Sequence, residues 1–191
     1  MTDIGETLGG RYRLIELLGQ GGMATVHRAT DLVLEQQVAL KQLTLSATAP
    51  DRAHVVALFE REFHTLAQLK HPHVIGVFDY GLQSDLAPFY TMELLDGGDL
   101  RERSPLPWRE VCRLMFDVCS AVALLHSRRL LHRDITPRNI RCTQSGVAKL
   151  IDFGAMSPMS AGGSEVVGTP AFTAPETLQR LALDARTDLY S

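Results

Sequence analysis

Residues 132–139 read HRDITPRN, which places an aspartate and an asparagine five positions apart in a short polar stretch. Asp134 is suited to orient a hydroxyl group and to accept its proton. Asp152 ends an apolar run before Phe-Gly, and Asn139 and Asp152 could share a Mg²⁺ ion whose other ligands are phosphate and water. Each residue taken singly is typical of an Asx turn or a cap, so the pattern carries weight only as a set.

A cation for phosphate is expected from Lys41, which ends the apolar run VALK at 38–41. An ammonium group in a buried run needs a partner, because burying it unpaired is too costly. Glu62 lies on the apolar side of the next predicted helix and is the natural carboxylate. The two residues together predict an ion pair that aims the lysine at phosphates, although either one alone is typical of a solvated surface charge.

A glycine-rich segment at 18–26 reads LGQGGMATV and lies between two strand-like runs. Gly19, Gly21 and Gly22 would let backbone N–H groups approach a phosphate without interference from Cβ atoms. A glycine-rich hairpin turn explains the same residues nearly as well. The segment opens no helix, which argues against a dinucleotide-binding fold, and no GK[ST] follows it, which excludes a P-loop.

These residues need elements to position them, and strand-like runs dominate the first half of the chain. One helix interrupts them, with Asp51 as its N-cap and apolar residues at every third or fourth position over Val55–Leu69. Gly97–Gly98 then breaks the pattern and predicts a hinge. The expected strands lie around Arg11–Leu18, Thr25–Ala29, Val38–Leu43, Val74–Tyr80 and Phe89–Glu93.

In the second half, Pro107 suits the first turn of a helix whose apolar stripe should be core. A strand pair is expected at Ile140–Cys142 and Val147–Ile151, and a mobile loop at Ala155–Gly168. The three cysteines show no CxxC spacing and predict buried, reduced thiols rather than a disulfide or a zinc site. The stripe comprises Val111, Leu114, Met115, Val118, Val122 and Leu125, and the cysteines are Cys112, Cys119 and Cys142.

The composition narrows the class of protein. Hydrophobic residues make up 45% and charged residues 21% of the 191 residues, which is ordinary for a soluble globular chain. A net charge of -3 gives no reason to expect nucleic acid or an anionic membrane as a partner. The first residues do not resemble a signal peptide and no apolar run approaches a membrane span, so we expect a cytoplasmic protein with no membrane segment in this chain.

The motifs also occur in the order that one family uses, and the chain resembles a eukaryotic-type serine/threonine protein kinase of the kind that bacteria also carry. The resemblance runs from about Arg11 to the last residue. The matching residues are G-x-G-x-x-A-x-V at 19–26, V-A-L-K at 38–41, Glu62 nine residues before His71-Pro72, HRD at 132–134, Asn139, DFG at 152–154 and TAPE at 173–176.

The resemblance implies an α+β, two-lobed fold with ATP in the cleft. It divides the chain into an N-terminal tail at 1–10, a β-rich lobe with one main helix and the hinge at 11–95, and a partial, mostly helical lobe at 96–191. The last five residues, TDLYS, resemble the start of the helix whose aspartate braces the HRD backbone. The resemblance therefore predicts a fragment that lacks the last helices of the second lobe.

The family pattern also implies a role for each matching residue. Lys41 would hold the α- and β-phosphates of ATP and pair with Glu62, Asp134 would be the catalytic base, and Mg²⁺ would be held by Asn139 and Asp152. Met92 aligns with the gatekeeper. The residues implied to contact the nucleotide are Leu18, Gly19, Gly21, Gly22, Val26, Ala39, Lys41, Glu93, Leu95, Asp99 (at the ribose) and Arg141 (under the adenine).

Two departures from the family pattern affect the chemistry. Thr136 stands where most serine/threonine kinases have a lysine that touches the γ-phosphate, and Arg138 is the candidate to supply that charge instead. Arg141 stands where the family usually has an apolar floor under adenine, so its stem or its guanidinium plane would have to pack there.

Transfer of the ATP γ-phosphate to serine or threonine of protein substrates is the function that this set predicts. The alternative is a pseudokinase or inactive fragment that acts as a nucleotide- or protein-binding module, and a small-molecule kinase is a third hypothesis. Arg133 precedes the catalytic aspartate, an arrangement that the family commonly uses to grip a phosphate on the activation loop. Ser164 is the expected site of self-phosphorylation, with Ser160 as the second choice.

Overall fold

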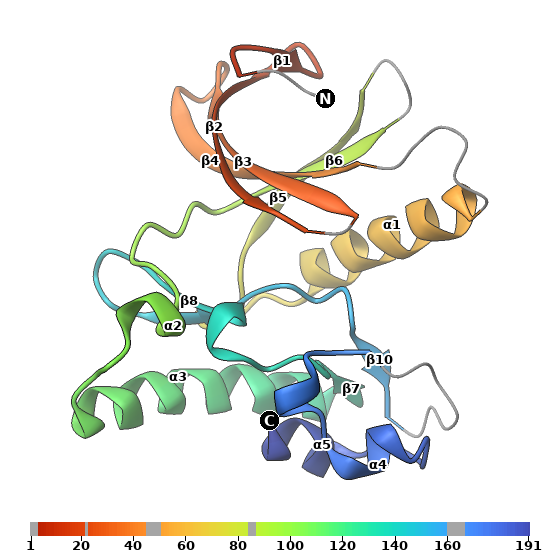
Figure 1. Ribbon diagram of the computed structural model, residues 1–191. Coiled ribbons are helices and arrows are strands. Elements are labelled where there is room, and N and C mark those ends of the chain that lie inside the picture. Colours follow the sequence, from red (N-terminus) through yellow and green to blue (C-terminus); the bar gives the residue numbers. More distant parts are fainter. Residues whose placement is uncertain (1–3, 22, 45–50, 84–86, 160–166) are drawn as a thin grey trace. The chain divides into compact units, whose positions relative to one another are not determined.

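The computed structural model describes residues 4–21, 23–44, 51–83, 87–159 and 167–191 (Figure 1). The chain forms two compact units, and both helices and strands occur, which confirms the α+β class. The first unit comprises Met1–Lys70 and Gly76–Leu94, and the second comprises His71–Ile75 and Leu95–Ser191. Among the described residues, no helix is long and apolar enough to cross a membrane.

The first unit is built on one six-stranded antiparallel sheet with the strand order β1-β2-β3-β4-β6-β5. Strands β4 and β6 are buried along most of their length, as expected for strands whose sheet is covered on both faces, whereas β3 alternates buried and partly buried residues. Their bounds are β1 (Thr7–Leu8), β2 (Tyr12–Gln20), β3 (Ala24–Asp31), β4 (Gln36–Leu43), β5 (Val77–Leu82) and β6 (Pro88–Met92).

Two predictions about the first unit need correction. The tail predicted for residues 1–10 is wrong for Thr7–Leu8, because these residues pair with β2 and Leu8 is fully buried. The strand predicted to start at Val74 starts three residues later, at Val77. Val74 instead forms a parallel bridge with Leu150, and Ile75 donates its N–H to the same residue, so both belong to the second unit.

Helix α1 (Arg52–Gln68) lies against one face of this sheet (Figure 1). Asp51 is its N-cap as predicted, but the aspartate side chain makes no capping hydrogen bond. Phe59 and Phe63 of α1 form a core with Leu43 and Tyr90 of the sheet. Because side chains alternate along each strand, the other face carries a separate core of Leu8, Tyr12, Leu14, Ala29, Val38, Leu40 and Phe89.

The second unit is organised around α3 (Trp108–Ser127), its longest described helix. The other elements of this unit are short, and many of them are single turns or strands of two to three residues. They are α2 (Leu100–Arg103), β7 (Leu130–Leu131), η1 (Pro137–Asn139), β8 (Ile140–Cys142), β9 (Ala148–Leu150), β10 (Ser157–Pro158), η2 (Pro170–Phe172), α4 (Pro175–Leu178) and α5 (Ala185–Tyr190).

The apolar stripe of α3 is only partly core, and two of the cysteine predictions are wrong. Val111, in the first turn, is 39% exposed, whereas the later stripe residues are mostly buried. Cys112 and Cys119 are exposed free thiols, and only Cys142 is buried. At about 100° per residue, Cys112 and Cys119 lie roughly 140 to 160° around the helix from buried Leu114, which explains their exposure.

The glycine pair at Gly97–Gly98 is fixed rather than hinge-like. Gly97 donates its N–H to the carbonyl oxygen of Cys142, and a Cβ atom on Gly97 would overlap the carbonyl oxygens of Cys142 and Thr143. Gly98 has a φ of +75°, which favours glycine. The boundary between the two units falls between Leu94 and Leu95 instead.

Candidate active site

The catalytic-loop candidates Asp134 and Asn139 meet in the second unit. The turn η1 brings the asparagine back toward the aspartate, and Asn139 Nδ2 donates to Asp134 Oδ2 at 2.8 Å and to the Asp134 carbonyl oxygen at 2.9 Å. Because the amide nitrogen is used in this way, the amide oxygen of Asn139 is the atom that remains to ligate a cation.

The other carboxylate oxygen of Asp134 is also engaged. Thr169 donates its backbone N–H to Asp134 Oδ1 at 2.8 Å, and Thr173 Oγ1 donates to the Thr169 carbonyl oxygen at 3.0 Å. Gly168 permits this approach, because it has a φ of +116° and a Cβ atom there would lie 2.8 Å from the carbonyl oxygen of Arg133. Residues 168–173 are therefore docked against the carboxylate that the sequence identifies as a base.

A second buried carboxylate braces the backbone just before Asp134. Asp188 Oδ1 accepts the N–H of Arg133 at 2.8 Å, and its Oδ2 accepts the N–H of His132 at 3.0 Å. This arrangement agrees with the bracing role expected for TDLYS. His132 itself is fully buried, and this burial lowers the pKa of its imidazole, which contacts the ring of Phe153.

Asp152 is exposed and stands in the left-handed region with a φ of +60°. The preceding residue, Ile151, donates its N–H to the carbonyl oxygen of Asn139 at 2.9 Å, which ties the two metal-ligand candidates together through the backbone. A carboxylate and an amide oxygen are hard donors, and such a pair fits Mg²⁺ better than zinc or a softer metal.

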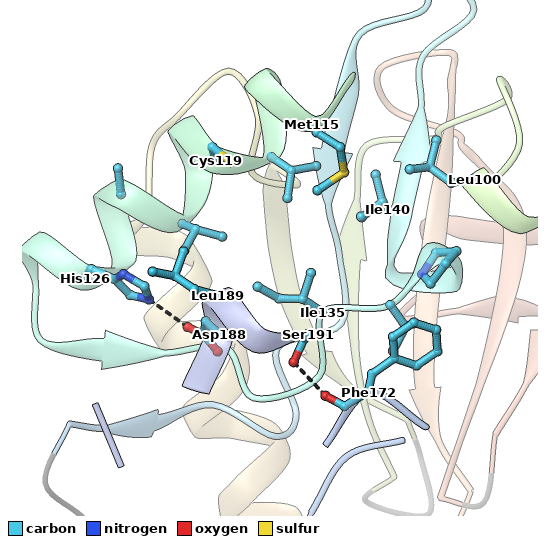
Figure 2. Close-up of a pocket in the computed structure, with 15 residues that line it drawn as sticks. Leu100, Met115, Cys119, His126, Ile135, Ile140, Phe172, Asp188, Leu189 and Ser191 are labelled. Atoms are coloured by element: carbon cyan, nitrogen blue, oxygen red, sulfur yellow. Dashed lines mark hydrogen bonds and ion pairs between the residues drawn. The ribbon is translucent and has the colours of Figure 1, made fainter. Parts of the chain in front are cut away.

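Thr136, which replaces the usual lysine, and Arg138, the candidate to supply its charge, have different surroundings. Thr136 is 4% exposed and lines an apolar groove of about 320 Å³, together with side chains such as Met115 and Ile140 (Figure 2). Arg138 lies in η1 and is exposed. Within the described part of the chain Arg138 makes no hydrogen bond or ion pair, so its guanidinium group is available to an external anion.

The first unit contains the predicted ion pair. Lys41 Nζ lies 2.9 Å from Glu62 Oε1 and 3.1 Å from Oε2. Tyr90 donates its hydroxyl to Glu62 Oε1 at 3.1 Å, and the lysine ammonium lies 5.8 Å from the Tyr90 ring centroid. Glu62 is only 6% exposed, so the carboxylate is satisfied by two donors inside the core.

The comparisons with known proteins decide the family. The protein kinase domain family matches residues 12–191, which is nearly the whole chain. The chain belongs to the protein kinase family. Its relatives include serine/threonine-protein kinase PksC of Streptomyces coelicolor, which is 38% identical over 200 residues that cover 96% of this chain and 36% of PksC.

Two further kinases from other bacteria are similar to a comparable extent. DNA damage-responsive serine/threonine-protein kinase RqkA of Deinococcus radiodurans is 38% identical over 98% of this chain and 29% of its own length. Serine/threonine-protein kinase PknB of Mycobacterium leprae is 33% identical over 96% of this chain and 31% of its own length. The chain thus spans about a third of the length of these relatives.

The remaining nucleotide-contact candidates divide between the two units. Val26 pairs with Lys41 across β3 and β4, and Ala39 lies two residues before the lysine, so these three side chains share one face of the sheet. Gly19 pairs with Val26, and Gly21 donates its N–H to the carbonyl oxygen of Ala24. Leu18 is 39% exposed. Gly22 lies outside the described residues.

Glu93 has a backbone role and a side-chain role at the end of the first unit. Its N–H donates to the Gly76 carbonyl oxygen at 2.9 Å. Its carboxylate accepts the N–H of Gly76 at 2.6 Å, a contact that the sequence gave no reason to expect. Leu95, the other hinge candidate, is 6% exposed and belongs to the second unit.

Asp99 and Arg141 are neighbours in the second unit, joined by an isolated antiparallel bridge. Asp99 is also the N-cap of α2, where its Oδ1 accepts the N–H of Glu102 at 2.8 Å in a capping box. The spacing D-x-x-E at 99–102 was the available signal for this cap. Arg141 is half-buried and pairs with Lys149 across β8 and β9.

The predicted self-phosphorylation sites Ser164 and Ser160 lie outside the described residues. Glu176 of the TAPE motif accepts the hydroxyl of Thr187 at 2.8 Å. His126, which lies 2.9 Å from Asp188, was missed, because 62 positions separate the two residues and no local pattern links them.

Proposed function

We propose that the chain transfers the γ-phosphate of ATP to serine or threonine hydroxyl groups of protein substrates, with Asp134 as the catalytic base. The observation that carries the proposal is the position of the Asp134 carboxylate, which Asn139 Nδ2 and Thr169 N hold from two sides. In the reaction the substrate oxygen bonds to the γ-phosphorus, the bond to the β-γ bridging oxygen breaks, and ADP leaves. Asp134 accepts the hydroxyl proton.

Mg²⁺ would be held by the amide oxygen of Asn139 and the carboxylate of Asp152, and when bound it neutralises phosphate charge. The backbone hydrogen bond between Ile151 and Asn139 supports this pairing, because it fixes the spacing of the two ligands. Lys41 would contact the α- and β-phosphates while Glu62 and Tyr90 hold its ammonium in place. Arg138 would stabilise the charge that develops on the γ-phosphate.

A nucleotide- or protein-binding module without transfer activity is the second candidate. One observation favours it: Thr136, which is 4% exposed, cannot supply a charge at the position where most serine/threonine kinases have a lysine. In that case nucleotide would bind through the Lys41–Glu62 pair, and no label would leave ATP.

Protein substrates and self-phosphorylation follow from the kinase function. We propose Ser164 as the self-phosphorylation site, with Ser160 as the second choice, and Arg133 as the residue that receives the phosphate. Such a phosphate would carry about -1.5 to -2 charges at neutral pH and would form charge-assisted hydrogen bonds with the guanidinium group. Arg133 is 8% exposed, and burial lowers the pKa of its guanidinium group, so an added phosphate would offset its desolvation.

The experiment is to incubate the chain with Mg²⁺, ATP labelled at the γ-phosphate and a generic basic protein, with a parallel reaction in a metal chelator. The proposal predicts label on serine and threonine of the basic protein, on the chain itself at 155–173, and in neither place when the metal is chelated. Nucleotide binding by calorimetry without any label transfer would favour the binding module instead.

A further inference from the structure

The last pair of the β5–β6 ladder departs from the ordinary hydrogen-bond pattern. Val77 pairs with Met92 in an antiparallel register, so the next pair along the two chains is Gly76 and Glu93. The Glu93 N–H donates to the Gly76 carbonyl oxygen at 2.9 Å, as in a pair whose two residues exchange both of their hydrogen bonds. In such a pair the Gly76 N–H would donate to the Glu93 carbonyl oxygen.

The Glu93 side chain accepts this hydrogen bond instead of the main chain. The Gly76 N–H donates to Glu93 Oε1 at 2.6 Å, and a Cβ atom on Gly76 would lie 3.4 Å from the same oxygen, so the carboxylate lies directly against residue 76. A carboxylate is a stronger acceptor than a neutral carbonyl group, and a short distance is typical of such charge-assisted bonds. The Gly76 N–H is therefore satisfied without the carbonyl oxygen of Glu93.

The carbonyl group of residue 93 matters because Glu93 is among the residues that the family pattern implies to contact the nucleotide. Adenine carries an exocyclic amino group, which donates hydrogen bonds and needs an acceptor such as a backbone carbonyl oxygen. A carbonyl oxygen that completes a ladder pair is directed at the neighbouring strand. The acceptor of the Gly76 N–H therefore decides whether the carbonyl group of residue 93 is held by the ladder or is released from it.

We infer that the Glu93 carboxylate is a positioning residue for adenine recognition, because it replaces the main-chain acceptor of Gly76 and releases the Glu93 carbonyl oxygen from that hydrogen bond. This inference rests on the proposed function for the identity of the ligand but not for the exchange of acceptors. Without the carboxylate, the Gly76 N–H donates to the main-chain carbonyl oxygen of residue 93, as in an ordinary ladder. The sheet keeps its hydrogen bond, and the adenine amino group loses its acceptor.

Two substitutions of Glu93 and one control separate this role from simple packing. Glu93→Leu keeps most of the side-chain volume and removes the acceptor. Glu93→Gln keeps an oxygen at the position of Oε1, so it should restore the hydrogen bond from Gly76. The matched control is Glu16→Leu, because the Glu16 carboxylate belongs to the same unit and bonds to Arg28 at the same distance of 2.6 Å, but at the surface.

The first measurement is the affinity of each variant for ATP, inosine triphosphate and tripolyphosphate by calorimetry with Mg²⁺. Inosine carries an oxygen where adenine carries the amino group, and tripolyphosphate has no base, so neither can donate to the carbonyl group at this position. We expect Glu93→Leu to bind ATP about 3- to 10-fold more weakly, through the loss of one neutral hydrogen bond. Its affinity for the other two should not change. Glu93→Gln should restore the affinity for ATP, and the Glu16 control should change none of the three.

The second measurement identifies the acceptor of the Gly76 N–H by NMR, from the scalar coupling across the hydrogen bond. We expect coupling to the side-chain carboxyl carbon of Glu93 in the wild type and to the main-chain carbonyl carbon of residue 93 in Glu93→Leu.

The NMR measurement needs neither nucleotide nor transfer, so a wild-type chain that binds no ATP would overturn the proposed function and leave the exchange of acceptors to be judged by itself. If Glu93→Leu does not fold, Glu93→Ala takes its place in both measurements. Coupling of Gly76 to the main-chain carbonyl carbon in the wild type would overturn the inference. Unchanged ATP affinity in Glu93→Leu, or an equal loss for all three ligands, would overturn it as well.

Discussion

Replacing Arg138 with alanine tests whether the catalytic loop supplies its own cation. Arg138 is exposed in η1, one residue before Asn139, and it makes no hydrogen bond or ion pair within the described residues. Its truncation therefore removes no hydrogen bond or ion pair with the described residues, and the free energy of unfolding should change by less than about 0.5 kcal/mol. A large effect of this substitution on the rate of transfer must therefore come from contacts with the substrate.

The expected kinetic effect follows from the charge. A hydrogen bond from a guanidinium group to a phosphate oxygen contributes about 1.5–3 kcal/mol, which corresponds to a loss of roughly 10- to 100-fold in kcat. ATP affinity should hardly change, because the charge that Arg138 meets develops only during transfer. Arg138→Lys keeps the charge without the planar fork and should fall between wild type and Arg138→Ala.

The assay is steady-state phosphate transfer at saturating ATP, with a thermal melt of each variant to confirm equal stability. Thr136 is a poor place to reintroduce the cation, because it is 4% exposed and lines an apolar groove. If Arg138→Ala turns over at the wild-type rate, the loop has no functional cation and the binding-module hypothesis becomes the better one.

Three further predictions follow from other parts of the structure. Lys41→Met should abolish ATP binding, as measured by calorimetry, and unchanged ATP affinity would refute the assignment. The substitution should also lower the melting temperature, because it leaves the buried carboxylate of Glu62 without its cation at a cost of about 3–5 kcal/mol. Adding Glu62→Gln should recover part of this stability. Gly97→Ala should destabilise the chain by about 1–3 kcal/mol, because its Cβ would overlap two carbonyl oxygens. Gly19→Ala, whose Cβ meets nothing within 4 Å, should keep the wild-type melting temperature. Equal melting temperatures in the two variants would contradict this prediction. Burial lowers the pKa of several imidazoles below the ordinary 6.5, so the unfolded state binds more protons than the folded state just below that pH. The free energy of unfolding in urea should therefore fall as the pH drops below about 6.5 and should be level above it. A flat profile would count against the burial of these imidazoles. These imidazoles belong to His27, His71 and His132.

Local rules predicted the elements whose reasons lie in neighbouring residues. Helix α1 could be predicted because its apolar residues recur continuously at every third or fourth position. It begins at Arg52, directly after the expected cap Asp51. The ion pair between Lys41 and Glu62 could be predicted because a buried ammonium and a carboxylate on an apolar helix face each need a partner. The short spacing of Asp134 and Asn139 in HRDITPRN also keeps the two residues near each other, and a hydrogen bond joins them.

Features that depend on distant contacts were missed or misread. Thr7–Leu8 was assigned to a tail because only its pairing with β2 makes it a strand. Gly97 suggested flexibility, but the carbonyl oxygens of Cys142 and Thr143 fix it, and the same glycine pattern in sequence fits either case. Cys119 was expected to be buried because free cysteines usually are, although it lies off the predicted apolar stripe of α3.

The most direct test of the central claim is the single-turnover rate of phosphate transfer by the wild-type chain and by Asp134→Asn. The substitution keeps the size of the side chain and removes the group that accepts the proton. Nucleotide affinity should be equal in the two proteins, because Asp134 is proposed to contact the hydroxyl group and not ATP. The account predicts transfer to serine and threonine by the wild type and a loss of about 10²- to 10⁴-fold in Asp134→Asn. Equal rates in the two proteins, or no transfer by the wild type with ATP bound, would contradict it.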